Sequence, residues 1–182
     1  MRPAVTFGQP PQIETERLTL RPIRDNDLEA LHAILSDPET MRYWSSLPHK
    51  DRAETSTWIA ANRAVVTAGT ALEYGAEYQG RLIGRAILWN GNELGYIFDK
   101  AHWGQGFAGE AVTALIDFAF LLRGLSEITA DIDPRNRASD KLLRRLGFRP
   151  TTYAERTFCI GGEWSDSQYF ALSREDWLAR KK

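Results

Sequence analysis

The chain has 182 residues, of which 43% are apolar and 26% charged, and its formal net charge is −1. This composition indicates one globular domain, and the near-zero charge gives no reason to expect binding to nucleic acid or to an anionic membrane. Cys159 is the single cysteine, which excludes an intrachain disulfide, and no segment has the apolar run of a signal peptide or a membrane span. We therefore expect a cytoplasmic protein.

The first half of the chain predicts one strand and two helices. Residues 1–12 contain three prolines and are expected to form a flexible lead-in to a folded domain over 13–178. Apolar positions alternate over 16–23, as in a half-buried strand. Helices are predicted over 25–35, where an aspartate provides the N-cap, and over 52–68, which ends at a glycine.

From residue 71 the apolar pattern changes to that of strands. Segments 71–78, 81–89 and 93–99 are separated by a Gln-Gly turn and an Asn-Gly turn, so an antiparallel meander is predicted. A glycine-rich segment then leads into a helix with apolar residues over 112–122. The remaining predicted elements are a helix over 138–148 and strands at 126–132, 152–160 and 164–172. No repeat or linker interrupts this order, which indicates a single α/β domain.

The glycine-rich segment at 103–111 reads WGQGFAGEA. Gly104, Gly106 and Gly109 match the dinucleotide-binding pattern G-x-G-x-x-G, and Asp131 lies where a ribose-binding carboxylate is expected. Three features oppose this interpretation. Several residues separate the strand from the first glycine, the strand belongs to an antiparallel meander, and the chain after Asp131 is too short for a second mononucleotide-binding half.

A P-loop is excluded more simply, because Glu110 and Ala111 stand where a P-loop has lysine and serine or threonine. What remains is the physics that both motifs share. Glycines let backbone N–H groups point inward, and a helix N-terminus adds partial positive charge, which suits a pyrophosphate. The segment by itself leaves a second interpretation open, a glycine-rich turn that only joins a strand to a helix.

A second motif follows at 133–148, which reads DPRNRASDKLLRRLGF. Together the two motifs resemble the GNAT N-acetyltransferase superfamily and, within it, the RimJ/RimL-like branch of ribosomal-protein N-terminal acetyltransferases. That branch has W/R-G-x-G-Y/F-A-x-E-A and then N-x-x-S-x-x-L-L-x-x-L-G-F. The opening TERLTLRP at 15–22 and the closing GEWSDSQYFAL at 162–172 also resemble it. The resemblance covers residues 13–178.

The resemblance implies a single GNAT-like α/β (α+β) domain with a central, mixed, twisted sheet of about seven strands flanked by helices. Two central strands would splay apart and hold the arm of acetyl-CoA, the co-substrate, and no metal is implied. Backbone groups after residue 96 would pair with the pantetheine arm, and those of the glycine segment would hold the pyrophosphate. The residues implied to bind acetyl-CoA are Ile97, Phe98, Asp99, Gly104, Gln105, Gly106, Phe107, Ala108, Gly109, Asn136 and Ser139.

Catalytic roles follow from the same resemblance. Glu93 matches the glutamate with which several members accept the proton of the amine, although it could also be a surface glutamate beside a turn. Glu110 opens a helix and is expected to cap or anchor it. Two positions depart from the superfamily. Trp103 replaces a usual Gln or Arg, and Leu143 replaces the Tyr that protonates the leaving thiolate in many members, so Ser139 or water must substitute.

The implied activity is direct transfer of acetyl from acetyl-CoA to a primary amine, which is a protein N-terminal α-amine or a small molecule. Tyr43, Trp44, Tyr74 and Trp89 fall on segments that would line the acceptor side, although such aromatics are core residues at least as often. The alternative is a non-catalytic acyl-CoA-binding sensor or interaction module on the same fold. The expected partner is the amine acceptor, with neither nucleic acid nor a membrane involved, and a homodimer is left open.

Overall fold

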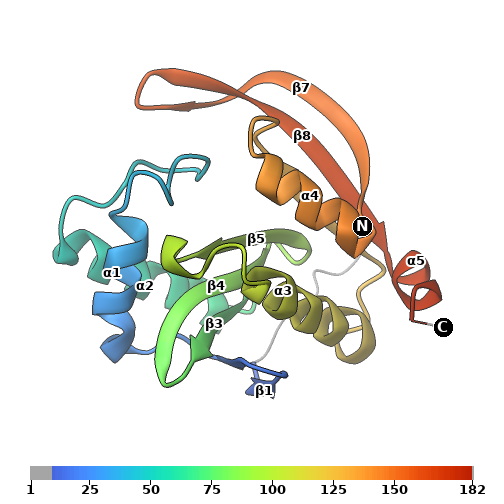
Figure 1. The fold of residues 1–182 in the computed structure, drawn as a ribbon, viewed down its shortest axis with the longest axis horizontal. Coiled ribbons are helices and arrows are strands. Elements are labelled where there is room, and N and C mark those ends of the chain that lie inside the picture. Colours follow the sequence, from blue (N-terminus) through green and yellow to red (C-terminus); the bar gives the residue numbers. More distant parts are fainter. Residues whose placement is uncertain (1–9, 182) are drawn as a thin grey trace.

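Residues 10–181 are described by a computed structural model, in which they form one eight-stranded sheet with the order β1-β2-β3-β4-β5-β6-β8-β7 (Figure 1). Residues 1–9, most of the expected lead-in, lie outside the described residues. The strands are β1 (Ile13–Glu14), β2 (Thr19–Arg21), β3 (Leu72–Tyr78), β4 (Arg81–Trp89), β5 (Glu93–Phe98), β6 (Glu127–Ile132), β7 (Arg149–Ile160) and β8 (Glu163–Ser173). The helices are α1 (Leu28–Leu35), α2 (Arg52–Thr67), α3 (Phe107–Asp117), α4 (Arg137–Leu146) and α5 (Arg174–Ala179).

Local sequence accounts for most of these boundaries. Asp51 caps α2 by accepting the N–H of Glu54 at 2.9 Å. Gly147 ends α4 with a φ of 96°, a conformation that glycine adopts without strain. The Gln-Gly turn is a two-residue hairpin loop and the Asn-Gly turn lies in a three-residue one, and both have positive φ at Gln or Asn and at Gly. The predicted meander of β3, β4 and β5 is therefore confirmed.

The predicted α/β fold with a mixed sheet is also confirmed, with two differences in detail. The sheet has eight strands rather than about seven, because the two-residue β1 pairs with β2. Helix α5 was not predicted, since its six residues follow β8 directly. Both elements are too short to show a hydrophobic period of their own, so only the pairing and packing of the folded chain reveal them.

The helices cover the two faces of the sheet in pairs. Helices α3 and α4 pack on one face, in a core that includes Leu94 and Phe170, while α1 and α2 pack on the other with Ile97. The second face also buries an ion pair, in which Arg85 Nε lies 2.8 Å from Glu73 Oε1 and the guanidinium stacks 4.5 Å from the ring of Trp58. The charge of Glu73 is therefore compensated by Arg85 within the core.

The centre of the sheet is where two neighbouring strands separate. Strands β5 and β6 are parallel and pair only at Glu93↔Thr129 and Leu94↔Ala130. Strand β4 continues to pair with β5 as far as Phe98, so the other edge of β5 is open beyond Leu94. The splayed pair expected from the sequence is thus present. The β7–β8 hairpin arches from the far side of the sheet towards the loop that follows α1 (Figure 1).

Candidate active site

A cleft of about 470 Å³ opens where β5 and β6 separate, and we call it the β5–β6 cleft. Residues of β5 and β6 line it, together with the loop at 41–48, the start of α4 and the β7–β8 hairpin. The loop and the hairpin meet across the cleft, because Leu47 packs over the hairpin turn, where a β-carbon on Gly161 would come within 3.1 Å of Leu47 Cδ2. Two segments more than 100 residues apart in sequence thus enclose one space.

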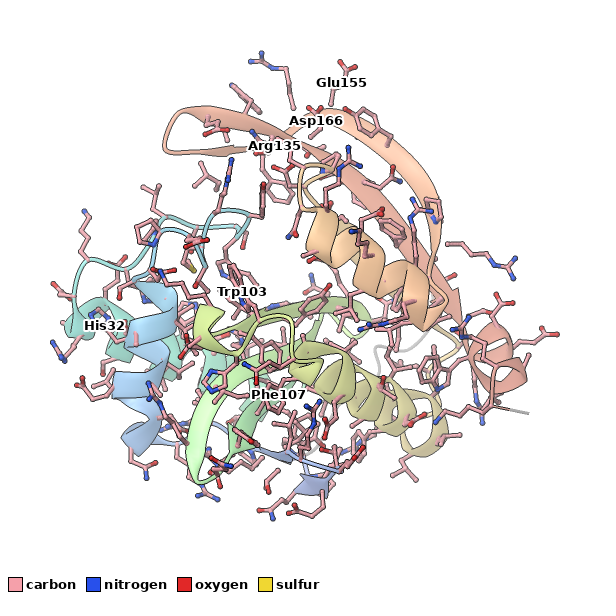
Figure 2. All side chains as sticks on the ribbon, in the orientation of Figure 1. His32, Trp103, Phe107, Arg135, Glu155 and Asp166 are labelled. Carbon is pink, nitrogen blue, oxygen red and sulfur yellow. The ribbon has the colours of Figure 1, made fainter. Side chains whose placement is uncertain are left out.

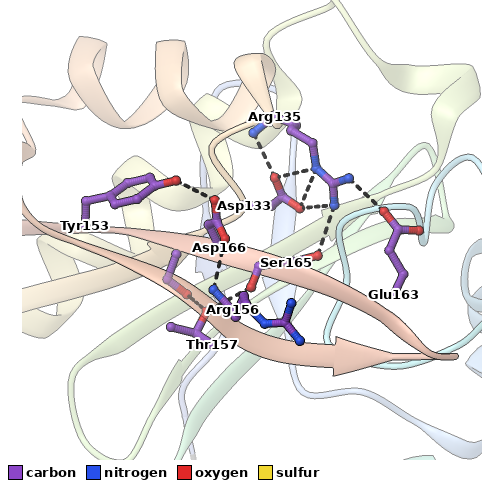
Figure 3. Close-up of polar contacts among 9 residues, drawn as sticks. Asp133, Arg135, Tyr153, Arg156, Thr157, Glu163, Ser165 and Asp166 are labelled. Carbon is purple, nitrogen blue, oxygen red and sulfur yellow. Dashed lines mark hydrogen bonds and ion pairs between the residues drawn. The ribbon is translucent and has the colours of Figure 1, made fainter.

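Arg135 fixes the hairpin against the loop between β6 and α4 (Figure 3). Its guanidinium donates to Asp133 Oδ2 at 2.7 Å, to Glu163 Oε1 at 2.7 Å and to Ser165 Oγ at 3.0 Å. Hydrogen bonds to carboxylates from one planar guanidinium restrict geometry more than single contacts do. This wall of the cleft is therefore held in place by the residue that precedes Asn136 in the second motif.

Three carboxylates that line the cleft form no ion pair within residues 10–181. One is Asp166, which accepts hydrogen bonds from the Tyr153 hydroxyl and the Arg156 N–H; the other two are Glu93 and Asp131. Neither Glu93 nor Asp131 forms an ion pair within the described part of the chain. Glu93 is exposed, whereas Asp131 is half-buried and accepts a hydrogen bond from Ser167 at 3.0 Å through Oδ2, while its buried Oδ1 has no hydrogen-bond partner among residues 10–181. Burial, with a contribution from the charge of Glu93, raises the pKa of Asp131. The arrangement suits a group that arrives with a positive charge.

The glycine loop, residues 103–109, has the geometry of an anion site. Gly104 and Gly106 have φ values of 73° and 84°, which other residues adopt only with strain. The first helical hydrogen bond of α3 runs from Glu110 N–H to the carbonyl of Gly106 at 3.0 Å, and within the described residues no side chain caps the helix. The N–H groups of its first turn therefore remain available to an anion, where the helix dipole adds favourable charge.

The N-terminal motif holds this loop in place. Glu110 accepts hydrogen bonds from the Thr15 hydroxyl at 2.6 Å and from Arg17 N–H at 2.7 Å, and it pairs with the Arg17 guanidinium at 2.7 Å. Arg17 also donates to the carbonyl of Gln105 at 2.9 Å and stacks 4.3 Å from the ring of Phe107. Burial raises the pKa of Glu110, but these hydrogen bonds outweigh it and leave the pKa below its usual value. Glu110 is the expected anchor, and it connects two of the four sequence motifs.

We predict that Glu110→Gln lowers the free energy of unfolding by about 1.5–3 kcal/mol, because hydrogen bonds to a charged acceptor are lost. A carboxylate with a depressed pKa stabilises the fold above its unfolded pKa, and this contribution is lost as pH falls through the folded pKa. In urea unfolding, the difference from the wild type should therefore be large at neutral pH and shrink on acidification. Glu155→Gln, at an exposed position on β7, is the control and should change stability by less than about 0.5 kcal/mol. An equal, pH-independent loss in both variants would contradict the anchor.

The structure revises which backbone groups face the open edge of β5. Asp99 N–H donates to the carbonyl of Ile83 on β4 at 2.9 Å. Because successive residues of a strand point their backbone groups to opposite edges, Ile97 also points to β4, and only Tyr96 and Phe98 point into the opening. The expectation that Ile97 and Asp99 offer their backbone to a ligand is wrong for this reason. Phe98 does face the opening.

Trp103 and Arg145 make two further contacts at the glycine loop that the sequence does not reveal. The indole N–H of Trp103 donates to the carbonyl of Phe98 at 2.8 Å, which ties the loop to the end of β5. Figure 2 shows Trp103 and Phe107 at the N-terminal end of α3. The side chain of Phe107 is buried, so only its backbone is available at the loop. On α4, Arg145 reaches the loop, since a β-carbon on Gly109 would lie 2.9 Å from its Nη2.

Three of the four expected acceptor-side aromatics line the β5–β6 cleft, namely Tyr43, Trp44 and Trp89. Trp44 lies over the strand floor, where a β-carbon on Gly95 would be 4.0 Å from its ring. Tyr74 does not line the cleft. Its side chain is fully buried on the α3 face of the sheet, with its ring centroid 6.0 Å from that of Phe118. The alternation of β3 puts it in the core, which corrects the expectation.

The second motif places its polar residues at the start of α4. The side chain of Asn136 caps the helix by accepting Ser139 N–H at 3.1 Å, and both residues line the cleft. Leu143, one turn further along, is completely buried in the core. Sequence reasoning missed Arg17, Arg145 and the cleft position of Asp131, which only the packing of distant segments brings to these sites.

Over residues 10–181 there is no group of three or more His, Cys, Asp or Glu side chains arranged to hold a metal ion. None of the helices in the same residues is long and apolar enough to cross a membrane.

Comparison with known proteins agrees with the family resemblance of the two sequence motifs. Residues 17–149 match the family model described as "Acetyltransferase (GNAT) domain". The chain is 35% identical over 171 residues to an uncharacterized N-acetyltransferase p20 of Bacillus licheniformis, covering 90% of this chain and 96% of that protein. It is 27% identical to the [ribosomal protein uS5]-alanine N-acetyltransferase of Escherichia coli, covering 91% and 92%. The crystal structure of spermidine N-acetyltransferase from Vibrio cholerae, in complex with CoA and spermine, superposes with a TM-score of 0.78 at 22% identity, covering 89% and 98%.

Proposed function

The chain belongs to the GNAT acetyltransferase family and is an acetyltransferase, and we propose that it transfers an acetyl group from acetyl-CoA directly to a primary amine. The observation that carries this proposal is the position of two carboxylates without ion-pair partners in the described chain, Glu93 on β5 and Asp131 on the neighbouring β6, in a cleft whose strand β5 is joined to the glycine loop by the hydrogen bond from Trp103 to Phe98. An amine is charged at neutral pH and must lose a proton before it can attack a thioester. A carboxylate pair attracts the ammonium, and one of the two accepts the proton.

The proposal assigns acetyl-CoA to the open edge of β5 and to the glycine loop. The free N–H groups at the start of α3 suit its pyrophosphate, and Arg17 and Arg145 add positive charge beside them. The backbone of Tyr96 and Phe98 would pair with the pantetheine arm in place of a neighbouring strand. Asn136 and Ser139, at the N-terminus of α4, would face the thioester end. The Phe98 N–H, which faces the same opening, would donate to the carbonyl oxygen as it gains negative charge.

The reaction needs no covalent intermediate with the protein. The nitrogen of the acceptor bonds to the acetyl carbon, the carbon–sulfur bond breaks, and its electron pair leaves with the sulfur of CoA. Glu93, which is exposed at the first position of β5, takes the amine proton directly or through water. Tyr43, Trp44 and Trp89 form the wall against which the carbon chain of the acceptor packs. The cysteine Cys159 is exposed on β7, outside this cleft, and has no part in the step.

For the acceptor we propose a protein N-terminal α-amine, with a small-molecule amine as the competing substrate class. The shape of the cleft is compatible with the flexible end of a peptide chain. It is open to solvent beside the exposed Glu93, and Leu47 and the hairpin turn cover its other side. The named relatives act on each of the two classes, a ribosomal protein in one case and spermidine in the other. We place the reaction in the cytoplasm.

The test is release of thiol from acetyl-CoA in the presence of a panel of N-terminal peptides and small amines. Turnover with at least one amine, with the acetylated product seen by mass spectrometry, is the expected result. CoA binding with no turnover on any amine would overturn the proposal and favour an acyl-CoA-binding sensor. Turnover with polyamines but not with peptides would reject the N-terminal acceptor and leave the transferase activity in place.

A further inference from the structure

A buried hydroxyl in the β5–β6 cleft has no partner. Tyr96 lies on β5, immediately beyond the last residue pairs that join β5 to β6, and it lines the cleft together with Ser139. Its hydroxyl is buried with the Ser139 side chain beside it, but no hydrogen bond of normal geometry joins it to any of the residues 10–181. A buried polar group without a full hydrogen bond destabilises a fold, so its retention in a cleft indicates that a ligand supplies the missing contact.

The position of Tyr96 answers a question that the sequence leaves open. In many related enzymes a tyrosine on the helix at position 143 faces the sulfur, and this chain has Leu143 there, on the buried face of α4. Tyr96 approaches the same end of α4 from the strand instead, and Ser139 is close enough to influence its ionisation.

The hydroxyl of Tyr96 keeps its proton at neutral pH. Burial raises the pKa of Tyr96 to about 12, against a smaller opposing effect of the Ser139 hydroxyl. A phenol with this pKa is a weaker acid than a thiol, so it does not give its proton away to a thiolate. It can donate a strong hydrogen bond to one, since bonds to a charged acceptor are about twice as strong as neutral ones.

We propose that the Tyr96 hydroxyl, with Ser139 beside it, is the hydrogen-bond donor to the sulfur of CoA as the carbon–sulfur bond breaks. This inference rests on the proposed transferase function. Nitrogen bonds to the acetyl carbon, and the electron pair of the broken bond stays on sulfur as a thiolate. Tyr96 stabilises that charge and retains its proton, and the thiolate takes a proton from solvent, while Glu93 returns to solvent the proton that it took from the amine. Tyr96 is a catalytic residue in this scheme because it touches a reacting atom.

The test is Tyr96→Phe, which removes one oxygen and leaves the ring in place. We expect kcat to fall roughly 10- to 100-fold, the range for a hydrogen bond to a developing charge, with KM for acetyl-CoA changed less than about twofold. A second measurement does not depend on turnover. The thiol of bound CoA, titrated by the ultraviolet absorbance of the thiolate, should have a pKa about one unit higher in the variant, because the thiolate has lost a donor.

Tyr74→Phe is the matched control, because Tyr74 is also a buried tyrosine on the same face of the sheet whose hydroxyl has no partner in the described chain, and it lies outside the cleft. It should leave both kcat and the thiol pKa as in the wild type. A Tyr96→Phe protein with wild-type kcat and an unchanged thiol pKa would overturn the inference. Failure of the wild type to acetylate any amine would instead reject the proposed function, while the titration of bound CoA would still decide whether Tyr96 faces the sulfur.

Discussion

Gly106→Asp should reduce the affinity for CoA at least about 100-fold, equivalent to about 2.7 kcal/mol of binding free energy. Gly106 precedes the first residue of α3 with a φ of 84°, and the N–H groups that follow it have no side-chain cap within residues 10–181. An aspartate there would accept those N–H groups itself and add a negative charge where a pyrophosphate must lie. A β-carbon at this position would also come within 3.4 Å of Arg17 Nη2, so the new carboxylate would neutralise a cation that we assign to the phosphates.

A control variant, Gly124→Asp, separates this effect from backbone strain. Gly124 has a comparable φ of 69° in the loop before β6, and a β-carbon there meets nothing within 4 Å. Gly124→Asp should therefore show the cost of a positive φ on stability and leave CoA binding unchanged. Isothermal calorimetry on variants whose thermal unfolding shows a folded state measures the binding. Affinity of folded Gly106→Asp within tenfold of the wild type would remove the pyrophosphate assignment. Micromolar binding of NADH to the wild type would revive the dinucleotide interpretation.

Glu93→Gln should keep CoA affinity and lower kcat/KM for the amine by roughly 10²–10⁴, the usual loss when a general base is removed. The amide has nearly the shape of the carboxylate but cannot take a proton. The wild-type rate should rise with pH along a limb that is absent or displaced in the variant. Raising the pH should partly rescue the variant, because a larger share of the acceptor amine is then already neutral.

Asp131→Asn decides which member of the carboxylate pair is the base. The two side chains interact, since the charge of Glu93 contributes to the raised pKa of Asp131. With Glu93 as the base, Asp131→Asn should cost less than about tenfold, under about 1.4 kcal/mol, and should leave CoA affinity unchanged. The reverse ranking would transfer the role to Asp131, and its raised pKa would set the acid limb at a higher pH. Losses below tenfold in both variants, with one shared pH profile, would show that the amine loses its proton to solvent.

The sequence alone determined most of the strands, turns and helix starts of this protein, because these features depend on residues that are close together in the chain. The alternation and the Asn-Gly turn over 81–99 predicted two paired strands, because side-chain direction and turn geometry are set within a few residues. The glycine loop was predictable for the same reason, since positive φ and a helix start are local properties. Two motifs in order then carried the resemblance to the GNAT family, and with it the fold, the splayed strands and acetyltransferase activity.

Tertiary structure alone decided which side chains meet. The pattern of β3 marks Tyr74 as a strand aromatic, but only the packing of α3 shows that it is core and not cleft wall. The contact of Glu110 with Thr15 and Arg17 spans more than 90 residues, and neither partner's role is visible locally. The same holds for Tyr96 and Ser139, which approach because a strand and a helix converge at the splay. Sequence fixes the period of each element, whereas distances between elements depend on how all of them pack together.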